Sequence, residues 1–439
     1  MIVILLAILL LTVYDYKRAV LVTASSLMLM PQWSSGLSGV KLSYIVILFQ
    51  CLYYFVWIYS NEKKICHDSY SMWIWIPCAM ASIGYILSNQ FGDVHNLPIT
   101  IVNVVNYFVY PYIVFKLISR KKDVLFYVKS MFVFFFIVEG YAVIEAILHN
   151  NFISEFSKNH GLTDGIMGTE TVGERFGFAR CSSILSYSSA LGMTSAITFF
   201  LFLYLTSKGY HFGIIKKLLL LILLPFGVLL SGTRSQMFVF AICLIPFLFY
   251  RSFIKTDTYK LLISFGCIIA FSLGSMFIVI IDSIIHSDKA AVGSSSDMRM
   301  EQLDICLYYL HSAPWFGHGK NYIWEYVRPY NPALYGAESV WFPTMVDYGL
   351  VGCFTYLLII IGLIVWLYKF DKILCFLPLA FLVGKSVSIV IGIELNYVII
   401  TSIVLIKTTQ FLRHEDILFT IRRLVNLSHI REVMIFRKK

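Results

Sequence analysis

Long apolar segments dominate this chain and restrict it to one class of structure. Apolar runs lie near residues 2–14, 18–31, 41–60, 71–89, 98–118, 124–148, 181–206, 212–230, 235–253, 259–284, 345–369, 372–390 and 392–411. A bilayer core about 30 Å thick is crossed by roughly 20 apolar residues in a helix. This chain has 439 residues and is 59% hydrophobic. A water-soluble fold of this size would have too little interior to bury all of these apolar residues. The sequence therefore predicts an all-α integral membrane protein with about 12 or 13 transmembrane helices.

Basic residues alternate between the loops on the two sides of the predicted helices. Loops on one side, with the tail that starts at Lys407, hold 23 of the 35 Lys and Arg residues, and loops on the other side hold 10. Cytoplasmic loops of membrane proteins are enriched in Lys and Arg, so this alternation predicts a cytoplasmic C-terminus. It also accounts for the formal net charge of +10 without nucleic-acid binding.

The predicted organisation is a polytopic transmembrane domain at residues 1–411 and a basic cytoplasmic tail at residues 412–439. The tail interleaves Arg and Lys with apolar residues, which indicates an amphipathic helix on an anionic membrane surface or, alternatively, a solvated tail. Residues 1–14 carry no charge, so we expect a retained span rather than a signal peptide. The first two apolar runs are short and predict a hairpin that is tilted or partly re-entrant.

Two loops on the predicted outer side, near residues 149–180 and 285–344, are too long to be simple connectors, and long loops are usually functional or disordered. Their aromatic residues, glycines and charges argue against disorder. The first loop ends with Arg175 and Arg180, which flank a glycine and two phenylalanines. An arginine guanidinium is a rigid fork that matches phosphate oxygens. These arginines are candidates for phosphate binding, and the alternative is pairing with nearby glutamates or anchoring at lipid headgroups.

A tight turn on the predicted outer side, Ser231-Gly232-Thr233-Arg234-Ser235, joins two apolar runs. Arg234 lies on the side with few basic residues and close to the bilayer boundary, where an isolated charge is costly unless it has a function. The alternative is a side chain that snorkels to the membrane surface.

The second long loop begins with a predicted helix near residue 294, and Arg299 falls in its first turn. Apolar residues recur there at helical spacing, at Met300, Leu303, Leu307 and Leu310. This periodicity predicts an amphipathic helix that lies on the membrane. The next span is expected to start near Trp341.

The outer side therefore offers several arginines together with carboxylates in the second loop and the span that follows. These residues are Arg175, Arg180, Arg234 and Arg299, with Glu338 and Asp347. Arginines suit an anionic diphosphate and stabilise it as a leaving group, and a carboxylate can deprotonate an attacking hydroxyl.

Charged residues also occur inside predicted spans, at Glu139, Glu145, Lys385 and Glu394. Intramembrane ionisable residues are functional candidates by default, so a proton or ion pathway is an alternative function. Lys385 could pair with Glu139 or Glu394, and Glu145 could reach the outer interface. The histidines show no metal-ligand spacing and the cysteines form no C-x-x-C pair, so no metal cofactor is expected.

The order of these motifs resembles the O-antigen polymerase and O-antigen ligase superfamily of bacterial envelope enzymes, over about residues 170–370. The segments that carry the resemblance are Arg175–Phe178, the Ser231–Ser235 turn, Arg299, Pro314–Gly319, the polar pair Glu338-Ser339 and Tyr348–Gly352. The resemblance implies a multi-span, lipid-sugar glycosyltransferase of GT-C-like architecture in the inner membrane. Its substrate would be an undecaprenyl-diphosphate-linked oligosaccharide on the periplasmic side, and it would need no metal or nucleotide.

The resemblance also implies roles for residues. Arg175, Arg180 and Arg234 would bind the diphosphate, whereas Glu338, Arg299 and Asp347 would be the catalytic candidates. Ligases typically have His-Asn at the polar pair, so Glu338-Ser339 favours a repeat-unit polymerase with Glu338 as the general base and inversion at the anomeric carbon. A membrane protein that regulates chain length would be a partner. A glycan ligase and a transporter of the lipid-linked unit remain alternatives, although we find no internal repeat typical of transporters.

Overall fold

The computed structural model describes most of the chain. The described residues are 2–27, 42–61, 71–159, 174–175, 178–185, 187–210, 212–272, 296–331, 334, 339–388 and 395–412. The labelled elements, in chain order, are α1 (Ile2–Tyr14), α2 (Tyr16–Ser26), α3 (Leu42–Asn61), α4 (Met72–Phe91), α5 (Leu97–Val104), η2 (Val105–Val109), α6 (Tyr110–Leu117), α7 (Lys121–Leu148), α8 (Phe152–Asn159), β1 (Glu174–Arg175), β2 (Phe178–Ala179), α9 (Ser188–Ser207), α10 (Ile214–Leu230), α11 (Arg234–Leu248), α12 (Arg251–Ile254), α13 (Asp257–Ser272), α15 (Ser296–Ser312), η4 (Ile323–Val327), η5 (Arg328–Tyr330), α16 (Trp341–Phe370), η7 (Lys372–Cys375) and α17 (Phe376–Ser386). A C-terminal helix, Leu395–Leu412, follows.

The helical membrane fold predicted from the apolar runs is confirmed. Within the described residues, five helices are long and apolar enough to cross a membrane. These are Leu97–Leu117, Lys121–Leu148, Ser188–Ser207, Trp341–Phe370 and Leu395–Leu412. The described β-structure is a hairpin in which β1 pairs antiparallel with β2. The larger number of spans and the two-domain organisation remain predictions, since parts of the expected spans and the tail beyond residue 412 lie outside the described residues.

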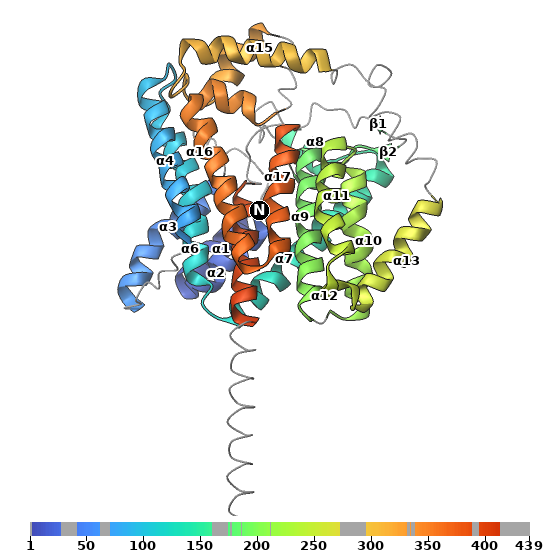
Figure 1. Cartoon of the computed structure of the whole chain (residues 1–439). Coiled ribbons are helices and arrows are strands. Elements are labelled where there is room, and N and C mark those ends of the chain that lie inside the picture. The colour runs from blue at the N-terminus through green and yellow to red at the C-terminus, as the bar shows by residue number, and fades with distance from the viewer. Residues whose placement is uncertain are drawn as a thin grey trace, which may run out of the picture.

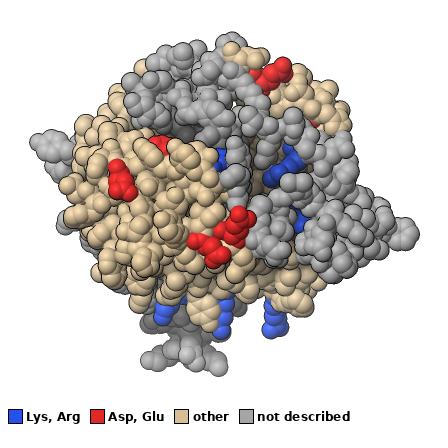
Figure 2. All heavy atoms as spheres, turned by 90° about the horizontal axis from the view of Figure 1, so that it is seen from above, with Lys and Arg blue, Asp and Glu red and all other residues tan. Residues whose placement is uncertain are grey.

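The molecule has two distinct ends. Figure 1 shows α15 lying across one end, which we call the α15 end, and α12 at the opposite end, which we call the α12 end. Figure 2 looks onto the α15 end and shows Lys and Arg side chains near the middle of that face. The long helices run between the two ends, so each end collects one set of the connecting loops.

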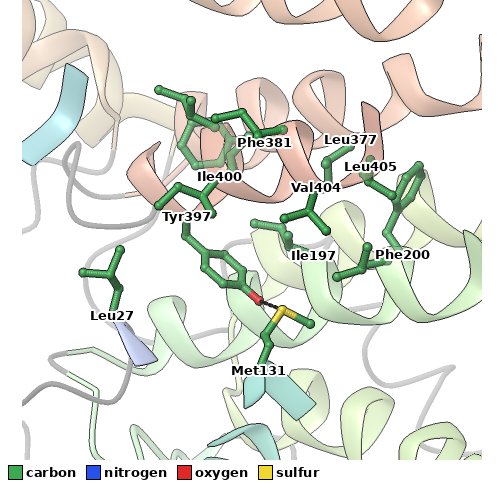
Figure 3. Packing of buried hydrophobic residues seen from close by; sticks show 14 of the residues in the cluster. Leu27, Met131, Ile197, Phe200, Leu377, Phe381, Tyr397, Ile400, Val404 and Leu405 are labelled. Carbon is green, nitrogen blue, oxygen red and sulfur yellow. Dashed lines mark hydrogen bonds between the residues drawn. The ribbon is translucent and has the colours of Figure 1, made fainter. Parts of the chain in front are cut away.

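Helix α9 forms the centre of the bundle, because nearly all of its residues are buried. It packs against α10, α11 and α17. Figure 3 shows part of this core, where Tyr397 of the C-terminal helix reaches toward Met131 of α7. The Tyr397 hydroxyl also lies 2.7 Å from Thr198 Oγ1 of α9. A helix that is apolar on all sides needs such burial by neighbouring helices.

The two N-terminal helices agree with the predicted short hairpin. Helices α1 and α2 have 13 and 11 residues, which is shorter than the roughly 20 residues of a full span. Gln50 of α3 holds both: its Nε2 lies 3.2 Å from Thr12 Oγ1 and 2.9 Å from Thr23 Oγ1. The chain therefore folds back between these two threonines.

Helix α16 differs from the single span that the sequence predicted. Gly349 interrupts it with a non-helical backbone at φ 62° and ψ −160°. The ring of Trp341 lies 5.5 Å from that of Tyr356, although these residues are 15 apart in sequence. The first part of α16 therefore folds back on the second, and residues 350–370 alone are long enough to span, at about 30 Å.

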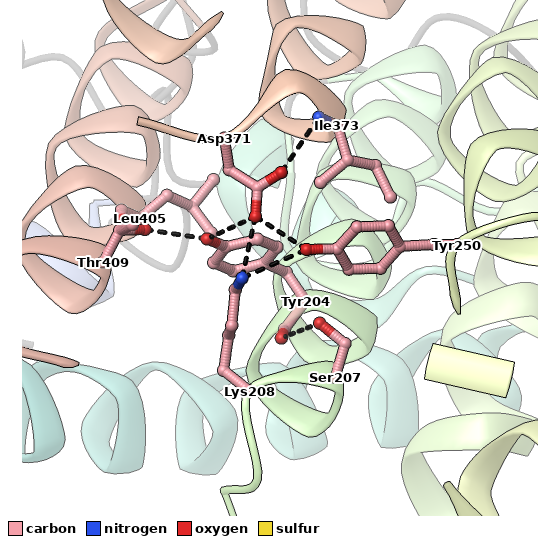
Figure 4. Close-up of polar contacts among 8 residues, drawn as sticks. All are labelled: Tyr204, Ser207, Lys208, Tyr250, Asp371, Ile373, Leu405 and Thr409. Carbon is pink, nitrogen blue, oxygen red and sulfur yellow. Dashed lines mark hydrogen bonds and ion pairs between the residues drawn. The ribbon is translucent and has the colours of Figure 1, made fainter. Parts of the chain in front are cut away.

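The α12 end is held by a polar network that joins four helix ends (Figure 4). The Nζ of Lys208 lies 2.8 Å from Asp371 Oδ2 and 3.0 Å from the Tyr250 hydroxyl. The Tyr204 hydroxyl contacts Asp371 and, at 2.7 Å, Thr409 Oγ1. The loops that meet here all belong to the basic, predicted cytoplasmic set. The geometry thus agrees with their placement on one side, while the orientation in the membrane remains a prediction.

Replacing Asp371 with asparagine is expected to destabilise the protein by about 2 kcal/mol at neutral pH, because it removes the charge from a half-buried ion pair. Burial raises the pKa of Asp371, but hydrogen bonds from Lys208 and Tyr250 outweigh burial and leave this pKa below its ordinary value. Burial lowers the pKa of Lys208, and its contact with Asp371 reverses that shift and raises it. The pair is therefore fully charged between the two ordinary values, about 4 and about 10.

The pH dependence of the stabilisation follows from the directions of the two pKa shifts. The contribution of Asp371 is present above the ordinary aspartate pKa and is lost as the pH falls through the lowered pKa, and that of Lys208 is lost only as the pH rises through its raised pKa. Thermal unfolding in detergent should show a lower midpoint for Asp371→Asn near pH 7 and a smaller difference in acid. Asp257→Asn is the control, because its pair with Lys260 is exposed and should contribute little. Equal loss in both variants would contradict the prediction.

Candidate functional site

The structure brings the segments of Arg180 and Arg234 together. The backbone N–H of Cys181 donates to the carbonyl oxygen of Leu230 at 2.8 Å, and Leu230 is the last residue of α10 before the turn that carries Arg234. Glu145 of α7 holds the segment that follows Arg180 by hydrogen bonds. Its carboxylate accepts from the N–H groups of Ser182, at 3.2 Å, and Ser183, at 2.6 Å. Glu145 therefore positions the segment that follows Arg180.

The turn that carries Arg234 is shaped by its own side chains. Ser231 Oγ donates to the carbonyl of Val228 at 2.6 Å and lies 2.9 Å from Thr233 Oγ1. Gly232 supplies the left-handed backbone, with φ at 59°. Arg234 then opens α11. The first amides of a helix have no partner inside it and form its positive end, so the start of α11 suits an anion.

The side chain of Arg234 is available at this helix start. It is half-buried, and within the part of the chain that the structure describes its buried Nε has no hydrogen-bond acceptor. A buried donor of this kind is expected to find a partner, because leaving it unsatisfied costs about 1–3 kcal/mol. An anionic ligand at the start of α11 would supply that acceptor.

Lys385 is a further basic residue on a helix that packs next to α11. It is 1% exposed and lies near the end of α17. Two contacts place α17 next to α11. Gln236 Nε2 lies 3.5 Å from Ser388 Oγ, and a side chain on Gly384 would collide with Val239 and approach Met193 within 2.7 Å. Because α17 has 11 residues, it rises only about 16 Å, which places Lys385 inside the bundle rather than at its surface.

The chain just after Glu338 also reaches this point. The N–H of Val340 donates to the carbonyl of Lys385 at 2.9 Å, and Trp341 Nε1 donates to Ser386 Oγ at 2.9 Å. Ser339 is buried. Glu338 itself lies outside the described residues, as does Glu394, so their predicted roles remain predictions.

The other two predicted arginines lie in β1 and in α15. Arg175 is in β1, paired with Phe178, and so precedes Arg180 in the same hairpin segment. Arg299 is in the first turn of α15 and is half-buried. It lies on the helix face that also carries Gln302 and Cys306, both fully buried, so Arg299 faces inward from the helix that lies across the α15 end (Figure 1).

The predicted placement of α15 on the membrane remains a prediction. Met300 and Leu307 are 59% and 44% exposed, whereas Cys306 packs with Ile323 and Val327 in a small core of the second loop. The buried side of α15 therefore contacts the core of its own loop, and Met300 and Leu307 are left exposed on the other side.

Asp347 lies in a different setting from the arginines. Its carboxylate accepts from the N–H groups of Asn321, at 2.9 Å, and Ile323, at 3.0 Å, and it is 4% exposed. Its own carbonyl accepts from Ser88 Oγ at 2.7 Å and from the N–H of Gly319 at 3.0 Å. These contacts favour a positioning role, in which Asp347 fastens the second loop to α16 and α4. Its predicted catalytic role remains untested.

Other titratable groups are engaged in structural contacts. His318 Nδ1 lies 2.5 Å from Asp93 Oδ2, and its Nε2 lies 2.9 Å from Ser312 Oγ. Glu139 accepts from Ser195 Oγ at 2.5 Å within the bundle. Within the described residues, no group of three or more His, Cys, Asp or Glu side chains could hold a metal ion.

The sequence alone missed three parts of this site. The sequence predicts Lys385 as an intramembrane charge. That its helix lies next to α11, which begins at Arg234, follows only from the packing of α17 on α11. Gln236 and Ser388 carry no sequence signal that distinguishes them from ordinary helix-end polar residues. Charge on the side with few basic residues is the signal that makes Arg180 and Arg234 candidates, and their roles remain predictions.

Comparison with known families gives one match within the chain. Residues 218–357 match the family model described as O-antigen ligase. These residues are similar to that family, and the match supports the O-antigen ligase and polymerase superfamily. A search of curated proteins found no match. The matched O-antigen ligase region runs from α10 to the middle of α16 and includes Arg234, Arg299 and Asp347. It supports glycan transfer of the O-antigen ligase and polymerase type. Together with the apolar helices, it supports a multi-pass location in the bacterial inner membrane.

Proposed function

We propose that the protein is a repeat-unit polymerase that joins undecaprenyl-diphosphate-linked oligosaccharides on the outer face of the inner membrane. The observation that supports this proposal is the proximity of the segments that carry Arg180, Arg234 and Lys385, which meet near the start of α11 and beside the segment that follows Glu338. A helix start with cationic residues on three adjoining segments suits a diphosphate. The α15 end then faces the periplasm, and the α12 end and C-terminus face the cytoplasm.

The proposed reaction is a displacement at the anomeric carbon of the lipid-linked donor. A hydroxyl of the acceptor glycan forms a new bond to this carbon and gives its proton to the carboxylate of Glu338. The bond from the anomeric carbon to the diphosphate oxygen breaks, and undecaprenyl diphosphate leaves with the electron pair. Arg180, Arg234 and Lys385 stabilise the charge that develops on the diphosphate, and Arg299 and Arg175 belong to the same anionic site. Direct attack inverts the anomeric centre.

A ligase that transfers finished glycan to another acceptor is the second candidate, and the description of the matching family favours it. The polar pair Glu338-Ser339, in place of the His-Asn typical of ligases, supports the polymerase instead. A polymerase of this kind is also expected to work with a membrane protein that regulates chain length.

The test is the length distribution of the surface polysaccharide in the host. The protein is deleted, and the strain is complemented with wild type, Glu338→Gln, Arg299→Ala and Arg180→Ala at equal expression. We expect deletion to leave a single repeat unit on its acceptor, and the three variants to fail to restore the ladder of longer chains. Arg251→Ala, at the α12 end, is the matched control and should restore it.

Other outcomes of the same gel decide against the polymerase. Full-length polymer held on the lipid carrier after deletion would identify a ligase. Accumulation of repeat units inside the cell would identify a transporter, and the site residues named above would lose their assigned roles.

A further inference from the structure

An open apolar groove of about 680 Å³ lies between α4 and the part of α16 that follows Gly349. Ile83 and Gly84 of α4 and Phe354 of α16 line it, with Trp315 and Trp341 at its margins. Ile83 and Phe354 are 58% and 56% exposed, so the groove is open along the side of the bundle rather than closed inside it. Its volume falls in the range of about 300–1,000 Å³ that is usual for ligand sites.

Two glycines create this groove. Gly84 has no side chain, and a Cβ there would lie 3.0 Å from Val351 Cγ1, so α4 and α16 approach closely at the base. Gly349 reverses the chain and brings Trp341 beside Tyr356, which adds a second wall. A continuous helix through residue 349 would place Trp341 far from this point.

The groove adjoins the candidate site through Trp341. The indole of Trp341 lines the groove, while its Nε1 donates to Ser386 Oγ. The preceding residue, Val340, donates to the carbonyl of Lys385. A molecule whose charged end is held by Arg234 and Lys385 would therefore find an apolar channel that starts at Trp341 and opens to the membrane.

We propose that this groove holds the polyprenyl chain of the lipid-linked substrate, with the diphosphate at the start of α11. The inference rests on the proposed function and adds the place where the lipid lies. Lipid tails are as apolar as the groove, so no hydrophobic driving force favours one chain over another. The diphosphate supplies the affinity, and the fit between the two tryptophans orients the first part of the chain so that the anomeric carbon faces the acceptor.

Photo-cross-linking tests the position of the chain directly. Benzoylphenylalanine is placed at position 83 or 354, and at position 137 of α7 as the control, because Ile137 is 55% exposed and belongs to a different helix. The purified protein is mixed with radiolabelled undecaprenyl diphosphate in vesicles of phosphatidylethanolamine and phosphatidylglycerol. We expect label at positions 83 and 354, removed by unlabelled undecaprenyl diphosphate, and little label at position 137. Equal label at all three positions, or cross-links to phospholipid alone, would overturn the proposal.

Kinetics with donors of two chain lengths provide the second test. Ile83→Trp partly fills the groove, and Ile137→Trp is the matched control. With an undecaprenyl donor we expect Ile83→Trp to raise KM about tenfold at nearly unchanged kcat, because the indole obstructs the path of the chain while the diphosphate is bound and so weakens ground-state and transition-state binding alike. With a donor that carries only two isoprene units, the effect should disappear. An effect of the same size on both donors would indicate a structural defect and contradict the proposal.

The two proposals fail in different ways. If the wild-type protein makes no polymer from either donor, the polymerase function fails, and the cross-linking result still decides the groove. If polymer forms and Ile83→Trp behaves like Ile137→Trp, the function stands and the groove is not the site of the chain.

Discussion

Replacing Arg234 with alanine is expected to lower the rate of polymer formation by about 100-fold or more, the usual result of removing one preorganised donor to a developing charge. The guanidinium opens α11, and its buried Nε has no acceptor among the described residues. The loss should therefore appear mainly in kcat. Alanine is a good helix residue, so α11 is expected to remain folded.

The measurement is the initial rate with purified protein and a synthetic lipid-linked repeat unit. Arg234→Lys should retain part of the activity, because lysine keeps the charge but lacks the rigid fork. Arg251→Ala is the control for loss of a basic residue remote from the site. A rate for Arg234→Ala within about twofold of wild type would show that this side chain does not stabilise the transition state.

Replacing Gly349 with alanine is expected to destabilise the protein by about 3 kcal/mol or more, and to reduce the yield of folded protein. Its φ of 62° and ψ of −160° lie in a region that is essentially restricted to glycine. A Cβ there would lie 2.7 Å from the backbone of Trp315 and from the N–H nitrogen of Gly317. Neither backbone can move without breaking the contacts between the second loop and α16.

Thermal unfolding in detergent, followed by the monodisperse fraction, measures this effect. Gly140→Ala on α7 is the matched control, since a Cβ there meets nothing within 4 Å. It should be neutral or slightly stabilising because alanine is the better helix residue by up to about 1 kcal/mol. An unchanged midpoint for Gly349→Ala would show that the chain reversal at this residue is not rigid.

The fold class was predictable from the sequence because the length of each apolar run is set by the thickness of the bilayer. The reversal at Gly349 was not, since two apolar helices that fold back on each other give the same hydropathy as one long helix. The side of α15 that packs against the second loop could not be read from the sequence either. Hydrophobic spacing marks which residues are apolar, but the partners around Cys306 decide which side is covered.

The sequence indicates candidate charges for the site but not how the segments that carry them are arranged. Arg180 and Arg234 stood out because they break the charge pattern of the loops. Their proximity depends on one backbone hydrogen bond, between Cys181 and Leu230, which no local pattern encodes. The same holds for Asp347, whose carboxylate suits a general base by composition but is engaged by two backbone amides in the folded chain.

The network of Lys208, Tyr250 and Asp371 has a consequence for the release of a bulky product. It clamps helices at the α12 end, while the candidate site lies toward the other end. Helices that are fastened at one end can tilt as rigid bodies about that end. A tilt of about 5° over a length of about 30 Å displaces the far end by about 3 Å. We therefore expect the path for a growing glycan to widen by splaying at the α15 end, while the clamped end keeps the membrane sealed.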